Sequence, residues 1–298
     1  MTETQCHFVS SHGILKSCSL VILNFNEPNI VFNIQNLKKG KTLYLKAELV
    51  IPFYKRFWSF IKNPIVVVSG NEDITFPEIC QNEPEVLDNF INEPNLIHWF
   101  SQNLSLRKPK CTQIPIGLDY HTLYAHLGMG HPWGNGQMPY VQEHFLKQIQ
   151  QHKVPWEKRY PIAFCNWHFY SDRGDRKELL EKVNKECLFL VPSYQNRLDS
   201  WVSQTQFAFV ASPRGGGIDC HRTWEALCLG CVPIVKSTGM DELFKDLPVW
   251  IVKDWSELTP IAFAEKKELF GKKEFQDLFS SEKLSLAYWT NKINHSTN

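Results

Sequence analysis

The chain has 298 residues, of which 43% are hydrophobic, so it can bury a sizeable core and is long enough for two domains of ordinary size. It carries 32 Lys and Arg against 31 Asp and Glu, without a block of like charges. This balance argues against a nucleic-acid partner and against binding to an anionic membrane surface.

No stretch approaches the roughly 20 apolar residues of a membrane span, and the first residues lack the basic start and apolar core of a signal peptide. We therefore expect a soluble, cytoplasmic protein without stable membrane insertion. The nine cysteines are an odd number and lie mostly in apolar runs, which indicates reduced core residues rather than a disulfide framework.

The first half of the chain contains short apolar runs separated by helical segments. The predicted strands are residues 20–23, 42–45, 65–68, 96–100 and 112–115, and the predicted helices are 54–61, 84–91 and 142–151. The glycine-rich segment 128–136 is expected to be a mobile loop. A linker is expected near 153–156, where a proline ends the preceding helix.

The second half alternates more regularly. Apolar runs at 161–165, 187–191, 207–211, 231–235 and 249–252 alternate with helical segments near 175–184 and 197–203, after the glycines at 215–217, and from 256. Near-continuous apolar strands separated by helices predict a parallel sheet covered on both faces. We expect an α/β fold with one Rossmann-like domain at residues 1–155 and another at 156–274. A last helix within 275–298 is expected to pack back on the first domain.

The segment 212–227 follows the apolar run 207–211 and is the most informative part of the sequence. A strand, a glycine turn, a helix and a second strand succeed one another, and the helix N-terminus of such a unit holds phosphate. Gly215, Gly216 and Gly217 allow close backbone approach and positive φ, so that N–H groups can point at an anion. The remaining predicted members of this nucleotide-diphosphate cradle are Ser212, Arg214, His221 and Arg222.

Glu225 is the only charged residue between Arg222 and Lys236, in a stretch that looks buried. A buried carboxylate must be paired or bound to something. One interpretation is a salt bridge to Arg222 or His221, and the other is a carboxylate that accepts both hydroxyls of a nucleotide ribose. A plain dinucleotide fingerprint fits less well, because Cys220 stands where the third glycine is needed.

Several segments together resemble the donor-binding half of exostosin-like glycosyltransferases, over roughly residues 160 to 260. They are residues 212–219, 222–227 and 230–235, followed by Leu247-Pro248 and Asp254-Trp255. In related transferases with a Glu-x7-Glu signature, a first glutamate lies eight positions before the ribose-binding one. That position is Gly217 here, so only Glu225 carries over.

The resemblance implies two Rossmann-like domains facing a cleft, the GT-B glycosyltransferase architecture. It also implies a nucleotide-diphosphate sugar as co-substrate, which we expect to be a UDP-sugar, and a glycan acceptor that is modified with inversion at the anomeric carbon. The expected activity is therefore that of a hexosyl- or pentosyltransferase.

Ligands of open parallel sheets bind beyond the carboxyl ends of the strands, so other loops of the second half supply further candidates. Arg173 and Arg176 are predicted to reach the diphosphate, Tyr194 the nucleobase, and Lys236 the donor sugar or phosphate. The alternative is that the arginines pair with neighbouring acids on a solvated face and that Tyr194 packs on the surface.

Sugar transfer also needs a group that removes a proton from the acceptor hydroxyl. Asp73, with Glu72 beside it, follows the predicted strand 65–68 and is the first candidate. Asp119 and His121 follow another predicted strand and are alternatives. Each of these residues could instead be structural or position the acceptor.

The sequence contains no Asp-x-Asp motif of the kind that holds a divalent ion against a diphosphate. Side chains and helix dipoles must then stabilise the leaving group, so we predict no metal requirement. Two alternative functions stay open: an NAD-dependent oxidoreductase or epimerase, and a non-catalytic protein that binds a sugar nucleotide or a glycan.

Overall fold

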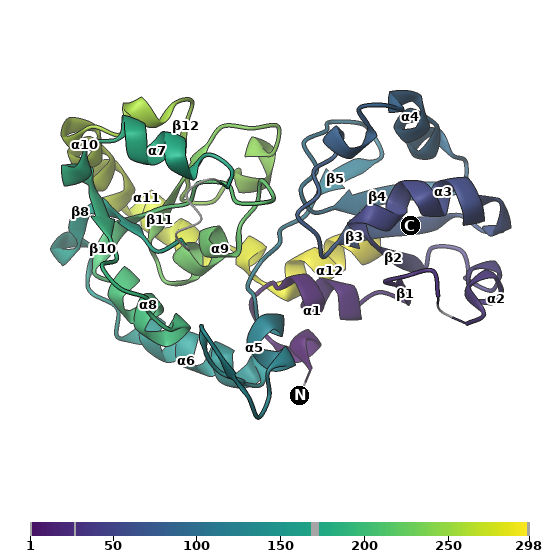
Figure 1. Cartoon of the computed structure of the whole chain (residues 1–298), viewed down its shortest axis with the longest axis horizontal. Helices are drawn as coiled ribbons and strands as arrows, with labels where there is room; N and C mark the ends of the chain where they lie inside the picture. Colours follow the sequence, from purple (N-terminus) through teal and green to yellow (C-terminus); the bar gives the residue numbers. More distant parts are fainter. Residues whose placement is uncertain (1, 27, 168–172, 297–298) are drawn as a thin grey trace.

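The computed structural model describes residues 2–26, 28–167 and 173–296, which form two lobes, each built on a parallel five-stranded sheet (Figure 1). The first sheet has the order β1-β2-β3-β4-β5, with β1 (Leu20–Ile22), β2 (Thr42–Lys46), β3 (Ile65–Gly70), β4 (Leu96–Ser101) and β5 (Cys111–Gln113). The second has the order β12-β11-β10-β8-β9, with β8 (Tyr160–Cys165), β9 (Leu188–Leu190), β10 (Phe207–Ala211), β11 (Val232–Lys236) and β12 (Trp250–Val252).

Helices cover both sheets and connect the strands. Those that precede the second sheet are α1 (Ser11–Lys16), α2 (Ile30–Gln35), α3 (Val50–Phe57), α4 (Pro84–Asn92), α5 (His121–Ala125) and α6 (Pro139–Gln151). Those within and after it are α7 (Arg176–Lys182), α8 (Arg197–Gln204), α9 (His221–Cys228), α10 (Pro260–Gly271), α11 (Lys273–Asp277) and α12 (Leu286–His295).

The central strand of the first lobe shows why the sheet is covered on both faces. Residues 65–68 are all fully buried, as expected for a parallel strand with helices on each side. Ile65 and Val67 pack in the cluster that contains the apolar residues of α2, α3 and α4. Val66 and Val68 belong to the other cluster, which includes residues of α1 and continues into the second lobe.

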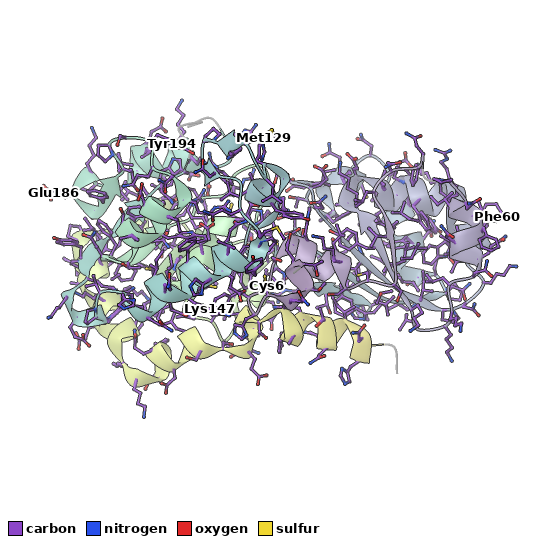
Figure 2. All side chains as sticks on the ribbon, turned by 90° about the horizontal axis from the view of Figure 1, so that it is seen from below. Cys6, Phe60, Met129, Lys147, Glu186 and Tyr194 are labelled. Atoms are coloured by element: carbon purple, nitrogen blue, oxygen red, sulfur yellow. The ribbon has the colours of Figure 1, made fainter. Side chains whose placement is uncertain are left out.

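The C-terminal helices run beneath both lobes (Figure 2). Helix α12 contacts α1 of the first lobe, and the N–H of Leu286 donates to the carbonyl of His7. Helix α6 packs against α8 of the second lobe. The division of the chain at residues 155 and 156 stays a prediction.

Every strand of the two five-stranded sheets lies within a residue or two of its predicted position, but two helices begin earlier than predicted. The helix expected at 54–61 is α3, with Pro52 in its first turn, and α6 begins at Pro139. Proline is tolerated there because the first N–H groups of a helix have no partner within it.

The segment 128–136 holds a small hairpin of β6 (Gly130–His131) and β7 (Gly134–Asn135). Among the described residues, no helix combines the length and apolar character needed to cross a bilayer.

Candidate functional site

A cavity of about 370 Å³ lies where the loops after β8, β9 and β10 meet the first lobe. This volume is within the range of small-molecule sites, and its place beyond the carboxyl ends of parallel strands is the one expected for a ligand. Of the residues predicted from the sequence, the cavity is lined by Asp73, Arg173, Arg176, Tyr194, Gly215, Gly216, Gly217, His221, Arg222 and Glu225.

Three of these residues form an arginine cluster beside the glycine turn: Arg173, Arg176 and Arg222. Arg176 is the first residue of α7 and is buried. Burial lowers the pKa of its guanidinium, and the positive charges of Arg222 and Arg173 lower it further. Like charges held together at a cavity wall favour an anion between them, because the anion relieves their repulsion.

The glycine turn is approached closely from both lobes. A Cβ at Gly215 would stand 3.0 Å from a terminal nitrogen of Arg176. A Cβ at Gly216 would overlap the Asp73 carboxylate, and one at Gly217 would stand 2.6 Å from the amide nitrogen of Asn103. At Gly216 and Gly217 the absence of a side chain is therefore required by the approach of the first lobe, whereas none of the three glycines has the positive φ that the sequence allowed.

Glu225 lies one turn into α9 at the wall of the cavity. Burial raises the pKa of its carboxyl group, while Arg197 and His221 act in the opposite direction. Its Oε1 is 3.9 Å from Nε of Arg197, which is too long for a hydrogen bond. Among the described residues, Arg197 is the ion-pair partner of Glu225. Neither Arg222 nor His221 therefore forms the salt bridge that the sequence offered as an alternative.

Three of the residues predicted to bind the nucleotide sugar do not line the cavity. The Ser212 hydroxyl bonds that of Thr223 at 2.8 Å and is buried in the second lobe. Lys236 donates to both carboxylate oxygens of Glu178 at 2.8 Å. Arg214 is exposed, and its backbone carbonyl lies against Gly174.

The two acids after β3 are separated by the structure. Asp73 lines the cavity beside Gly216, whereas Glu72 forms an ion pair with Lys46. Asp73 is therefore the one of the two whose carboxylate faces the space where a substrate would bind.

Asp119 and His121, the other predicted bases, do not line the cavity. Asp119 is buried and accepts a hydrogen bond from Nη2 of Arg197 at 2.9 Å. Although burial alone would raise the pKa of Asp119, Arg197 and two histidines hold it well below its usual range. Burial lowers the pKa of His121 to about 4. Neither group is thus set up as a strong base at neutral pH.

Asp219 and Arg197 connect the two lobes, and neither was predicted as a site residue. The Asp219 carboxylate accepts hydrogen bonds from the N–H of Ile116 in the first lobe at 2.8 Å and from the indole of Trp224 at 2.9 Å. Burial raises the pKa of Asp219 to about 6. Asp219 stands in the glycine-turn motif, but Arg197 is an ordinary helix-start residue in sequence, and no local pattern marks it.

The comparisons with known proteins concern the fold. The chain matches no protein-family model, and its sequence matches none of the curated proteins. Among solved structures it is similar to HepE of Anabaena in complex with UDP, with 15% identity, a TM-score of 0.50 and coverage of 90% of this chain and 80% of HepE. It is also similar to α,α-trehalose-6-phosphate synthase of Burkholderia multivorans, with 11% identity, a TM-score of 0.45 and coverage of 88% and 72%.

The likeness to HepE and the two parallel sheets confirm the predicted fold class: two Rossmann-like domains facing a cleft, as in GT-B glycosyltransferases. At this identity the likeness concerns the fold. A shared fold does not determine function.

Proposed function

We propose that this chain is a glycosyltransferase that moves a sugar from a UDP-sugar to a hydroxyl of a glycan acceptor. The observation that carries the proposal is the arrangement of charge in one cavity. Arginines surround the glycine turn at one part of the cavity wall. The Glu225 carboxylate lies one helical turn further along, in α9. A nucleoside diphosphate presents this pair of features, an anionic diphosphate and a ribose whose hydroxyls donate to a carboxylate.

The proposed binding mode assigns each part of the donor to residues of the second lobe. Arg173, Arg176 and Arg222, together with the start of α9, would hold the diphosphate and stabilise its negative charge as it leaves. Tyr194, about half exposed in the loop after β9, would cover the nucleobase. The leaving group is then neutralised by side chains without a metal ion.

Asp73 is the proposed general base. It would take the proton of the acceptor hydroxyl while that oxygen attacks the anomeric carbon, in a single displacement that inverts the configuration. Its position on the first lobe, at the wall of the cavity and against Gly216 of the second lobe, supports this assignment. Membership in the exostosin-like family rests on the motifs of residues 212–235 together with Leu247-Pro248 and Asp254-Trp255, and the inverting outcome rests on that resemblance.

The structure of HepE contains UDP and has a fold similar to that of this chain, which supports UDP as the nucleotide. The test is thermal unfolding of the purified chain with UDP, GDP and NAD in parallel. A ligand at about 100 times its dissociation constant stabilises a protein by roughly 2.7 kcal/mol, which visibly raises the melting temperature. We expect a rise with UDP and none with NAD, whereas a rise with NAD alone would contradict the proposal.

Binding is separated from catalysis by a second measurement. Release of UDP from UDP-sugars is followed with a panel of glycan acceptors. Acceptor-dependent release with a new glycosidic product is expected of a transferase. Binding of UDP without turnover for any donor and acceptor pair would favour the non-catalytic alternative.

A further inference from the structure

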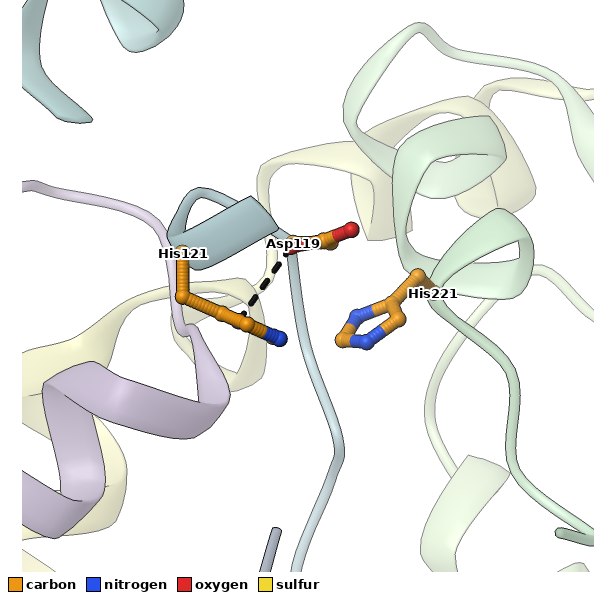
Figure 3. Close-up of side chains that lie close together, drawn as sticks. All are labelled: Asp119, His121 and His221. Carbon is orange, nitrogen blue, oxygen red and sulfur yellow. Dashed lines mark ion pairs between the residues drawn. The ribbon is translucent and has the colours of Figure 1, made fainter. Parts of the chain in front are cut away.

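Asp119, His121 and His221 form a cluster at the junction of the lobes (Figure 3). Asp119 and His121 lie at the start of α5, and His221 is the first residue of α9. One potential ligand atom from each lies within 4.8 Å of the other two. Nδ1 of His121 and Oδ1 of Asp119 are 3.2 Å apart, close to the separation of two ligands bound to one metal ion.

Hydrogen bonds with neighbouring groups hold two of the three side chains, His221 and Asp119, in the protonation state and orientation that binding of a metal ion requires. Nδ1 of His221 lies 2.7 Å from the carbonyl oxygen of Gly117. A carbonyl can only accept, so Nδ1 carries the proton and Nε2 keeps its lone pair. A histidine whose other ring nitrogen bonds a backbone carbonyl is the usual arrangement around a bound metal.

Asp119 is held in a similar way. Arg197 binds its Oδ2 at 2.9 Å, and the N–H of Thr122 binds its Oδ1 at 2.9 Å. Oδ1 faces His121, and a carboxylate oxygen can accept a second partner. The Arg197 charge opposes a cation, so we expect weaker binding than at a structural zinc site of thiolate ligands.

We propose that Asp119, His121 and His221 bind one divalent transition-metal ion, for which Zn²⁺ is the probe. Two imidazoles and one carboxylate are a ligand set that such ions accept, with a further position left for water or substrate. Because the ligands come from both lobes, the ion would tie the loop after β5 to α9. The site borders the cavity through His221 alone and does not take part in the proposed neutralisation of the diphosphate.

The test is Zn²⁺ binding to the metal-free full chain without nucleotide, by equilibrium dialysis and metal analysis. We expect about one ion per chain, with an affinity at least about tenfold lower in His121→Gln and in His221→Gln. His126→Gln is the matched control, because His126 caps the other end of α5 and bonds the carbonyl of Thr122. The control should bind Zn²⁺ like the unaltered chain.

A crystal of the unaltered chain soaked with ZnCl₂ gives a measurement that does not depend on variants. An anomalous peak at the zinc edge among the three side chains is expected. Peaks only elsewhere, no binding, or equal affinity of the cluster variants and the control would overturn the proposal. Because no nucleotide is present, such a failure leaves the proposed glycosyltransferase function standing.

Discussion

At the scale of single residues, the proposed function makes separable claims about two carboxylates. Glu225 is assigned to the ribose and Asp73 to the acceptor hydroxyl. One should therefore change nucleotide affinity and the other the rate of transfer. For each, another acid that does not line the cavity serves as a control.

Glu225→Gln removes the negative charge but keeps the size of the side chain. Hydrogen bonds to a charged group contribute about 1.5–3 kcal/mol, so we expect UDP affinity to fall about 10- to 100-fold. Isothermal titration calorimetry measures the affinity, and circular dichroism checks the fold. Glu178→Gln, which removes the partner of Lys236 outside the cavity, should bind UDP normally. Loss of the fold with unchanged UDP affinity in the folded fraction would favour a purely structural role for Glu225.

Asp73→Asn should lower the turnover number about 100- to 10,000-fold, the contribution of a general base. UDP affinity should change little, because the assigned nucleotide contacts lie in the second lobe. Steady-state rates and UDP binding are measured on the same preparation. Glu72→Gln is the control, since Glu72 pairs with Lys46 away from the cavity. Equal losses of rate in the two variants would contradict the assignment of Asp73.

At the scale of elements, Glu143 of α6 anchors the N-terminal segment. Its carboxylate accepts hydrogen bonds from the N–H groups of His7 at 3.0 Å and Phe8 at 3.1 Å and from Lys147 at 2.6 Å. Burial alone would raise the pKa of Glu143, but these bonds outweigh it and the pKa is lowered. A depressed acid pKa adds stability above the unfolded value of 4.5, and this stability is lost as the pH falls through the folded pKa.

Glu143→Gln should therefore lower the free energy of unfolding by about 2 kcal/mol at pH 7 and by progressively less as the pH falls below 4.5. Urea unfolding across this pH range measures the difference. The control is Glu181→Gln, which removes an exposed i,i+4 ion pair with Lys177 and should change stability by less than about 0.5 kcal/mol. A pH-independent effect of Glu143→Gln would show that the charge does not matter.

The strands and the glycine turn could be predicted because their signals are local. Apolar runs such as 207–211 are long enough to identify buried parallel strands, and Glu225 reaches the cavity because its helix starts where the turn ends. The direction of Lys236 could not be predicted, because it depends on Glu178, which is distant in sequence.

At the scale of the whole molecule, the cavity is completed by contacts between the lobes. The Asp219 carboxylate accepts a hydrogen bond from the N–H of Ile116, and Arg197 donates a hydrogen bond to the Asp119 carboxylate. Each lobe therefore positions side chains of the other. Contacts of this kind join residues about 80 to 100 positions apart, as the sequence separations of 78 and 103 show. No sequence periodicity marks such contacts, so the role of Arg197 could not be predicted.

The central claim is that this cavity binds the nucleotide of a sugar donor, and a crystal structure of the chain with UDP tests it most directly. We predict that the ribose hydroxyls bond the Glu225 carboxylate and that the diphosphate lies against Arg176 and the glycine turn. UDP bound elsewhere on the molecule, or in this cavity with its diphosphate turned away from the arginine cluster, would contradict the account.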